Sequence, residues 1–168
     1  MAQAAFQKLV EDGIIIRAHS GWCSPLHFVL KPDKSWRPVG DYRQLNAVTE
    51  KDVYPLPLIQ NFTAELHEKR IFTKIDITNA FWQVPVNSAD VPKTTITAPF
   101  GSFQFLHMNY GLINSSATFQ RFIDTVLDDL KPEGKVPRPI CCCAYIDDIL
   151  LSSSNETEHL EELEVLFK

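Results

Sequence analysis

Two adjacent carboxylates near the C-terminal end are the residues whose types and spacing most clearly indicate chemistry. Asp147 and Asp148 lie in the run Tyr145-Ile146-Asp147-Asp148, between apolar, strand-like segments at 139–144 and 149–151. We expect the pair to be buried with these strands. Burial of unpaired carboxylates costs several kcal/mol unless a proton, a cationic side chain or a divalent metal compensates the charge. No Lys or Arg lies within eight residues of the pair.

A third acid occurs in a similar setting much earlier in the chain. Asp76 ends the short apolar segment Ile71-Phe72-Thr73-Lys74-Ile75-Asp76. Carboxylate oxygens are the ligands that Mg²⁺ prefers, because it is a hard ion. Three acids at the ends of apolar strands therefore predict a magnesium site.

Length and composition restrict the class of protein. A chain of 168 residues corresponds to about one domain. It contains no apolar run near the roughly 18 residues of a membrane span and no secretory signal at its start, so we expect neither a membrane partner nor secretion. Three of the four cysteines are consecutive, which suits neither disulfides nor a zinc site. Reduced thiols in an intracellular compartment are the simpler interpretation.

The net charge of −5 argues against a nucleic-acid partner until its distribution is considered. Residues 145–168 carry seven acids and one Lys, so the preceding 144 residues carry 15 basic and 14 acidic groups. The segment 17–43 is modestly basic, with interleaved aromatic residues. The β-prone runs 26–31 and 36–41 within it are joined by a turn composition at 32–35, so we expect a hairpin that carries basic residues outward and could contact phosphates.

The pattern of apolar residues predicts helices mixed with strands without strict alternation. Steps of three and four among Phe119, Ile123, Val126 and Leu127 indicate the clearest helix. Such a mixture predicts an α+β fold rather than a doubly wound parallel sheet. We expect helices at 2–12, 58–66, 115–130 and 156–168, and strands at 14–17, 26–31, 36–41, 71–76, 81–86, 93–98 and 103–107, besides the two that flank the paired acids. His107 and His159 lack partners at ligand spacing and are expected at the surface.

Five blocks of sequence follow one another in a recognisable order. Each block alone is a weak signal, but chance agreement of all five at these intervals is very improbable. Together they resemble the fingers and palm of an LTR-retrotransposon reverse transcriptase of the gypsy type, almost from end to end of the chain. The blocks are Trp36 to Asn46 (WRPVGDYRQLN), Tyr54 to Pro57 (YPLP), Lys74 to Asp76 with Ala80 to Pro85 (KID, AFWQVP), Pro99 to Gly101 with Thr118 to Arg121 (PFG, TFQR), and Tyr145 to Asp148 (YIDD).

The resemblance implies an architecture. It implies fingers over about residues 1–55 and a palm over about 56–168, with an antiparallel, ferredoxin-like palm sheet backed by helices. The chain ends one helix after the paired acids, so we expect the family's thumb and RNase H domains to be absent from it. Remaining Pol domains, including thumb, RNase H and integrase, are implied partners in a longer polyprotein.

The resemblance also implies an RNA-directed DNA polymerase that uses two Mg²⁺ ions, with Mn²⁺ as a possible substitute. Asp76 and Asp147 would bridge the ions, Asp148 would add ligation or negative field, and the backbone carbonyl of Ile77 would complete one coordination shell. Loss of Asp76 is expected to abolish the chemistry and spare the fold. The implied place of action is intracellular, in the cytoplasm or in retroelement particles.

Further positions match the family's contacts to the incoming deoxynucleoside triphosphate. Lys31 and Arg37 match fingers residues that contact the triphosphate, and their charge complements it. Phe81 matches the bulky ring that excludes a 2′-hydroxyl, and Tyr110 is expected near the sugar and base. An RNA or DNA template with its primer is the implied macromolecular partner. Arg43 is expected to bond to Asp41 or to neighbouring backbone rather than to a template.

Two departures from the family pattern leave alternatives open. The family's prolines are replaced by Asn109 and Ser116, which is expected to loosen the loop before the long helix. The missing thumb and this loop favour a second hypothesis, a catalytically inactive remnant that binds nucleic acid or assembles with other chains. A carboxylate-based nuclease or phosphatase shares the metal chemistry, but it explains neither the basic hairpin nor Phe81.

Overall fold

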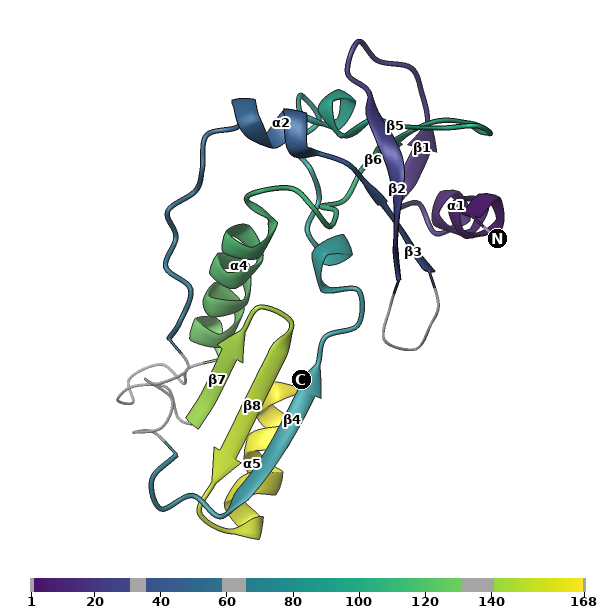
Figure 1. Cartoon of the computed structure of the whole chain (residues 1–168). Helices are drawn as coiled ribbons and strands as arrows, with labels where there is room; N and C mark the ends of the chain where they lie inside the picture. The colour runs from purple at the N-terminus through teal and green to yellow at the C-terminus, as the bar shows by residue number, and fades with distance from the viewer. Residues whose placement is uncertain (1, 31–35, 59–65, 131–140, 168) are drawn as a thin grey trace. The chain divides into compact units, whose positions relative to one another are not determined.

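The computed structural model describes residues 2–30, 36–58, 66–130 and 141–167 (Figure 1). By their contacts, the residues divide into two compact units, 1–51 with 79–115 and 52–78 with 116–168. The α+β class is confirmed. Assignment of fingers to about 1–55 and palm to about 56–168 stays a prediction, and 79–115 group here with the N-terminal segment. Most of the helix expected at 58–66 lies outside the described residues, as does Lys31.

A five-stranded sheet forms the centre of the first unit. Its strand order is β1-β6-β5-β2-β3, and all neighbours are antiparallel except β2 and β5. The expected hairpin is confirmed by the pairing of β2 with β3. The strands are β1 (Ile15–Arg17), β2 (Ser24–Leu30), β3 (Trp36–Gly40), β5 (Ile96–Ala98) and β6 (Gly101–Phe105).

An apolar cluster holds helix α1 (Ala2–Glu11) against this sheet. Phe6 from the helix packs edge-on against Phe103 from β6, with ring centroids 4.9 Å apart. The helix ends where Gly13 takes a φ of +72°, a conformation that glycine adopts without a Cβ penalty. A short helix, α2 (Arg43–Val48), follows β3.

Of two expected strands in the first unit, the one at 81–86 is wrong and the one at 93–98 is confirmed only over 96–98, as β5. The segment expected as a strand at 81–86 begins with the 3₁₀ helix η1 (Ala80–Gln83), in which Trp82 N–H donates to the Asn79 carbonyl at 2.9 Å. Asn79 itself has a φ of +54°, so the chain turns before it can extend. The segment at 93–98 starts in a second 3₁₀ helix, η2 (Val91–Thr94), whose first turn contains Pro92. Aromatic and β-branched composition suggested strands, but local turns decide the conformation.

The second unit has a three-stranded antiparallel sheet in the order β4-β8-β7. Residues of β4 alternate between exposed and half-buried, so one face of this strand is open to solvent. Figure 1 shows β4, β8 and β7 side by side. None of the helices that the structure describes has the length and apolar character needed to cross a membrane. The elements are β4 (Ile71–Asp76), α4 (Ser115–Asp129), β7 (Cys141–Tyr145), β8 (Asp148–Ser153) and α5 (Glu156–Leu166).

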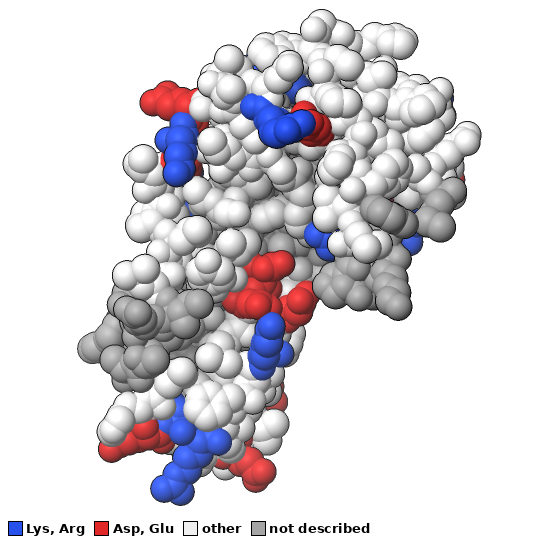
Figure 2. Space-filling model, viewed as in Figure 1, with Lys and Arg blue, Asp and Glu red and all other residues white. Residues whose placement is uncertain are grey.

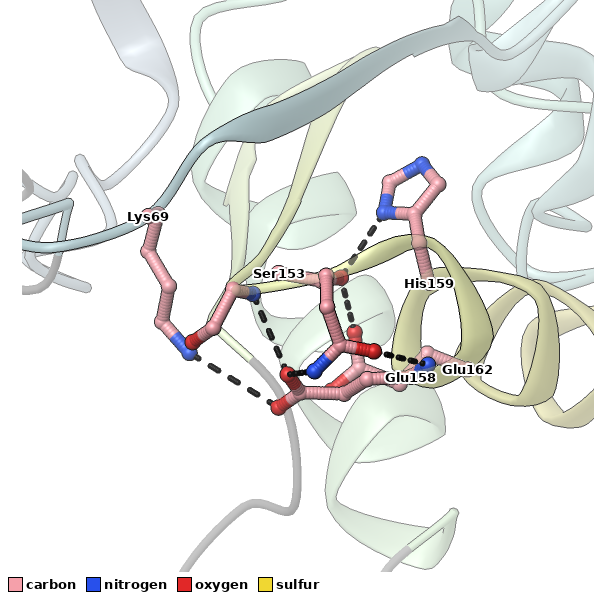
Figure 3. A network of polar contacts seen from close by, with 7 residues as sticks. Lys69, Ser153, Glu158, His159 and Glu162 are labelled. Atoms are coloured by element: carbon pink, nitrogen blue, oxygen red, sulfur yellow. Dashed lines mark hydrogen bonds and ion pairs between the residues drawn. The ribbon is translucent and has the colours of Figure 1, made fainter.

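Polar contacts join α5 to β4 and β8. The buried His159 ring lies between two hydroxyls, with Nδ1 2.7 Å from Ser153 Oγ and Nε2 2.7 Å from Thr73 Oγ1. Ser153 also donates to Glu162 (Figure 3). The expectation that His159 lies at the surface is wrong, because these hydroxyls supply the hydrogen bonds that burial of an imidazole requires. This network fixes α5 against the sheet.

Polar contacts from residues at the start of the second unit hold helix α4 in place. Arg121 forms an ion pair with Asp52, and its guanidinium lies 4.9 Å from the centre of the Tyr54 ring. The Tyr54 hydroxyl donates to Asp124 at 2.9 Å. The Tyr54 backbone N–H and the Arg121 side chain lower the pKa of Asp52 below its usual value. The segment that carries the motif Tyr54 to Pro57 is therefore anchored to the long helix.

Candidate active site

The register of β4 on β8, in the three-stranded sheet, brings Asp76 and Asp148 directly opposite each other. The next pair along the strands is joined by a hydrogen bond from Ile77 N–H to the Asp147 carbonyl, 2.9 Å long. Asp76 and Asp148 are therefore a non-hydrogen-bonded pair, the type in which Cα atoms lie about 4.5 Å apart. Acidic side chains gather over this edge of the sheet (Figure 2). Residues more than 70 positions apart in the sequence thus meet at one sheet edge.

Asp147 lies in a two-residue hairpin turn. Tyr145 and Asp148 are register partners, so Ile146 and Asp147 alone connect β7 to β8. Ile146 has a φ of +56°, the sign that tight hairpin turns require at their first central residue. A β-branched residue with positive φ is energetically unfavourable. Surrounding contacts must hold this turn in place.

Gln120 supplies those contacts from helix α4. Its side chain is fully buried. Its Oε1 accepts a hydrogen bond from Ile146 N–H at 2.8 Å, and its Nε2 donates to the Ala144 carbonyl at 3.1 Å. No role for Gln120 was predicted from the sequence. The available signal was a polar residue beside the buried face of a helix, next to Phe119 and Ile123, which requires a buried hydrogen-bond partner.

The expectation that the paired carboxylates are buried is wrong. Asp76 and Asp147 are exposed, and Asp148 is partly exposed, because they lie at a strand end and in a turn rather than within the strands. Asp148 nevertheless has a cationic partner, since Lys74 Nζ lies 3.0 Å from its Oδ1. The Asp148 carboxylate, with smaller contributions from Asp76 and Asp147, raises the pKa of Lys74 above its usual value. The residues around Asp148 in the sequence do not indicate this partner, because Lys74 lies on a distant strand and reaches Asp148 only through the register of β4 on β8.

The chemistry of these acids fits a divalent ion, with one condition. The donors are carboxylate oxygens on neighbouring strands and a turn, as Mg²⁺ requires. In the part of the chain that the structure describes, no group of three or more His, Cys, Asp or Glu side chains is arranged to hold a metal ion. Asp148 is instead engaged with Lys74. Ligation through Asp148 Oδ1 requires this oxygen to leave that pair.

A second set of predicted residues meets within the first unit. The Arg37 guanidinium lies 4.5 Å from the centre of the Tyr110 ring, and Phe81 packs edge-on against the same ring with centroids 4.9 Å apart. Arg37 and Tyr110 also line a pocket of about 350 Å³ in this unit. Three positions that are distant in sequence are therefore adjacent in space, and the Tyr110 ring connects them.

A comparison with known protein families agrees with this geometry. A model of the family described as reverse transcriptase (RNA-dependent DNA polymerase) matches residues 29–168. The chain belongs to the reverse transcriptase family. Its similarity to transposon polyproteins confirms the resemblance to an LTR-retrotransposon enzyme of the gypsy type.

Relatives of this reverse transcriptase chain are retrovirus-related and transposon polyproteins. The Pol polyprotein from transposon opus of Drosophila melanogaster is 37% identical over 164 residues, which are 95% of this chain and 16% of that protein. The Tf2-3 polyprotein of Schizosaccharomyces pombe is 36% identical over 154 residues, which are 92% of this chain and 11% of that protein. The chain thus spans about a sixth or less of the length of these curated relatives.

Solved structures of foamy viral protease-reverse transcriptase have the same fold. The complex with double-stranded DNA superposes with a TM-score of 0.87 at 26% identity, over 99% of this chain and 28% of that one. The complex with an RNA/DNA hybrid gives a TM-score of 0.84 at 26% identity, over 99% and 21%. The similarity confirms the fold class predicted from the sequence.

In this reverse transcriptase chain, hydrogen bonds restrain the loop that lacks the family's prolines. The Asn46 side chain donates to the Gly111 carbonyl at 2.8 Å and accepts from Ile113 N–H at 2.9 Å. Asn109 Oδ1 accepts from Tyr110 N–H, and Ser115 Oγ donates to the Asn109 carbonyl, both at 2.8 Å. The expected looseness is thus offset by side-chain amides. No loop-restraining role was predicted from the sequence for Asn46 or Asn109.

Arg43 has the structural role that the sequence predicts. Its guanidinium donates to both carboxylate oxygens of Asp41, at 2.8 and 2.6 Å. The hydrogen bonds from Arg43 lower the pKa of Asp41 to about 2. This bidentate pair fixes the entry into helix α2.

Proposed function

We propose that the chain catalyses template-directed addition of deoxynucleotides to a primer, on RNA or DNA, as part of a retroelement Pol polyprotein. Membership of the reverse transcriptase family supports this proposal. So do the complexes of the similar foamy viral proteins with double-stranded DNA and an RNA/DNA hybrid. The observation that carries it is the direct pairing of Asp76 with Asp148, beside the turn that bears Asp147.

The proposed metal ligands are Asp76, Asp147, Asp148 and the backbone carbonyl of Ile77. They would hold two Mg²⁺ ions, or Mn²⁺ in their place. When bound, such ions stabilise the charge that develops on the entering and leaving oxygens of an in-line displacement at phosphorus. The chain's own contribution is positional, because its strand register and the turn held by Gln120 place carboxylates at one edge before the substrate arrives.

The proposed nucleotide contacts are Lys31, Arg37, Phe81 and Tyr110. The Arg37 guanidinium is oriented by the Tyr110 ring, which leaves N–H donors for phosphate oxygens. Phe81 would exclude a 2′-hydroxyl by its bulk, and its packing against Tyr110 limits how far the ring can move aside. We also propose that the remaining Pol domains act with this chain, in the cytoplasm or in retroelement particles.

Primer extension on a poly-purine RNA template with Mg²⁺ and deoxynucleotides tests the proposal. We expect the Asp147→Asn variant to incorporate nucleotide about a thousandfold more slowly, because the lost charge stabilisation is several kcal/mol and each 1.36 kcal/mol is tenfold in rate. Asp129→Asn, an exposed acid at the end of α4, is the matched control and should retain activity. Equal incorporation by Asp147→Asn and the unchanged chain would exclude the assigned site.

The alternative is a catalytically inactive remnant that binds nucleic acid or assembles with other chains. The pairing of Asp148 with Lys74 favours it, because a carboxylate oxygen held in a salt bridge is less available to a metal. Absence of extension by the unchanged chain, together with binding of an RNA/DNA duplex in a fluorescence anisotropy titration, would establish this alternative.

Sugar discrimination gives a separate prediction. Alanine at position 81 should lower the preference for deoxynucleotides over ribonucleotides by roughly 10- to 200-fold, the range that one missing contact in an apolar pocket supplies. The comparison of kcat/KM for dCTP and CTP on a poly-purine template that contains guanine measures it. Phe122→Ala, which removes a partly exposed ring from α4, serves as the control and should leave the ratio unchanged. An unaltered ratio in Phe81→Ala would remove this residue from the nucleotide site.

A further inference from the structure

Lys74 lies beside the acidic edge, the end of the β4-β8-β7 sheet that carries Asp76, Asp147 and Asp148. It precedes Asp76 by two residues on β4, so both side chains point to the same open face of the strand. Its register partner is Leu150, which makes Asp148 its diagonal neighbour on β8. From there its ammonium reaches Asp148 Oδ1 at 3.0 Å. No role is assigned to this lysine by the site described above.

The pair of Lys74 with Asp148 is suited to opening. The two side chains are 66% and 46% exposed, and an ion pair in that setting is weak because solvent competes with it. Asp76 lies two residues further along the same face of β4 and directly opposite Asp148, so the ammonium lies beside a second carboxylate as well. The ammonium is thus the cation that offsets like charges placed directly opposite each other.

We propose that Lys74 is a built-in competitor of the divalent ion: its ammonium holds Asp148 Oδ1 in the metal-free chain and must release that oxygen before both carboxylate oxygens of Asp148 are available to the ion. The inference rests on the proposed metal site. Two opposite effects follow from one ammonium. It stabilises the sheet edge before an ion binds, and it lowers the affinity for the ion through repulsion and through occupation of a ligand.

Mn²⁺ binding, measured by titration calorimetry or by electron paramagnetic resonance without nucleotide or primer, tests this role. Lys74→Met keeps the length of the side chain and removes its charge. We expect this variant to bind Mn²⁺ roughly 3- to 10-fold more tightly at low salt, as expected for removal of one positive charge a few ångströms from a solvated divalent ion. Salt at about 1 M should shrink the difference by screening. Lys74→Arg should bind as the unchanged chain does, or more weakly.

A matched control is available in the same chain. Lys93 forms a 2.5 Å ion pair with Asp90, and its side chain is also half-exposed, but neither residue belongs to the acidic edge. Lys93→Met should leave Mn²⁺ affinity unchanged. Affinity in Lys74→Met that equals or falls below that of the unchanged chain, including no binding by either, would overturn the proposal.

Thermal unfolding provides a second measurement that does not depend on affinity. Metal-free Lys74→Met should melt at a lower temperature than the unchanged chain, and its gain in Tm on adding Mn²⁺ should be larger. Asp148→Asn with and without Lys74→Met completes a double-mutant cycle, and Lys74→Gln takes the place of Lys74→Met if the latter does not fold. In the Asp148→Asn variant, removal of the Lys74 charge should change Mn²⁺ affinity less than it does in the chain that keeps Asp148; an equal change would contradict competition for Asp148.

Failure of this inference and failure of the polymerase proposal give different results. Tighter Mn²⁺ binding by Lys74→Met without any primer extension would retain the competitor and reject the polymerase. Extension that depends on Asp147, combined with unaltered Mn²⁺ affinity in Lys74→Met, would retain the polymerase and reject the competitor.

Discussion

Asparagine in place of Asp76 is expected to reduce primer extension by about a thousandfold or more without lowering the melting temperature. The loss of activity follows from removal of a proposed metal ligand, because several kcal/mol of transition-state stabilisation correspond to factors of ten per 1.36 kcal/mol. The thermal result follows from the register. Asp76 lies directly opposite Asp148, and like charges in such a pair destabilise a sheet. The same substitution should therefore inactivate the chain and leave its fold equally or more stable.

Activity and unfolding must be measured on the same preparation to test this prediction. Primer extension gives the first quantity, and circular dichroism during heating without metal gives the second. Asp129→Asn removes an acid that lies on a helix, away from the paired strands, and should change neither quantity. An Asp76→Asn variant that retains more than about a tenth of the activity would contradict the ligand assignment. A clear drop in melting temperature would contradict the repulsion between the two strands.

Local patterns predicted the elements that carry the acids. Short apolar runs ending in Asp76 and flanking Asp147 gave β4, β7 and β8, and the steps of three and four gave α4. These elements lie where the apolar patterns predict them, because hydrophobic periodicity within a segment is a local property. The edge position of the acids followed from their place at the ends of strands.

Properties that depend on pairing between distant segments could not be predicted. The register of β4 on β8 is set by contacts across more than 70 residues, and it alone decides that Lys74 is diagonal to Asp148. One signal was available: strand periodicity places Lys74 and Asp76 on one face of the strand. This rule places Lys74 beside Asp76, but only the register brings it to Asp148.

At the 3₁₀ helix Ala80–Gln83, the local composition predicts the wrong element. Phe81 and Trp82 favour a strand by composition, yet i to i+3 hydrogen bonds close a turn at this point. β-propensity mainly describes packing on a sheet, so it fails where tertiary contacts place aromatic rings elsewhere. Here the Phe81 ring packs against Tyr110, a contact between residues that no local pattern connects.

Replacement of Gln120 by leucine is expected to lower the free energy of unfolding by about 2 to 4 kcal/mol. Leucine has a similar size but offers no hydrogen bond, so Ile146 N–H and the Ala144 carbonyl lose their partner, at about 1 to 3 kcal/mol for each unsatisfied group. The turn with the positive φ of Ile146 loses its support as well. Urea unfolding of both chains measures the difference.

The same variant separates positioning from simple stability. Because the turn carries Asp147, Gln120→Leu should raise the Mg²⁺ concentration needed for half-maximal extension at least severalfold, while the KM for deoxynucleotide stays within about twofold. Gln7→Leu is the matched control, since Gln7 lies on helix α1 and bonds to the exposed Glu11. A variant that loses stability but keeps its Mg²⁺ dependence would show that Gln120 supports the fold without positioning the acids. If stability and Mg²⁺ dependence change together, the buried amide of α4 sets the geometry of the metal ligands through the backbone of the turn.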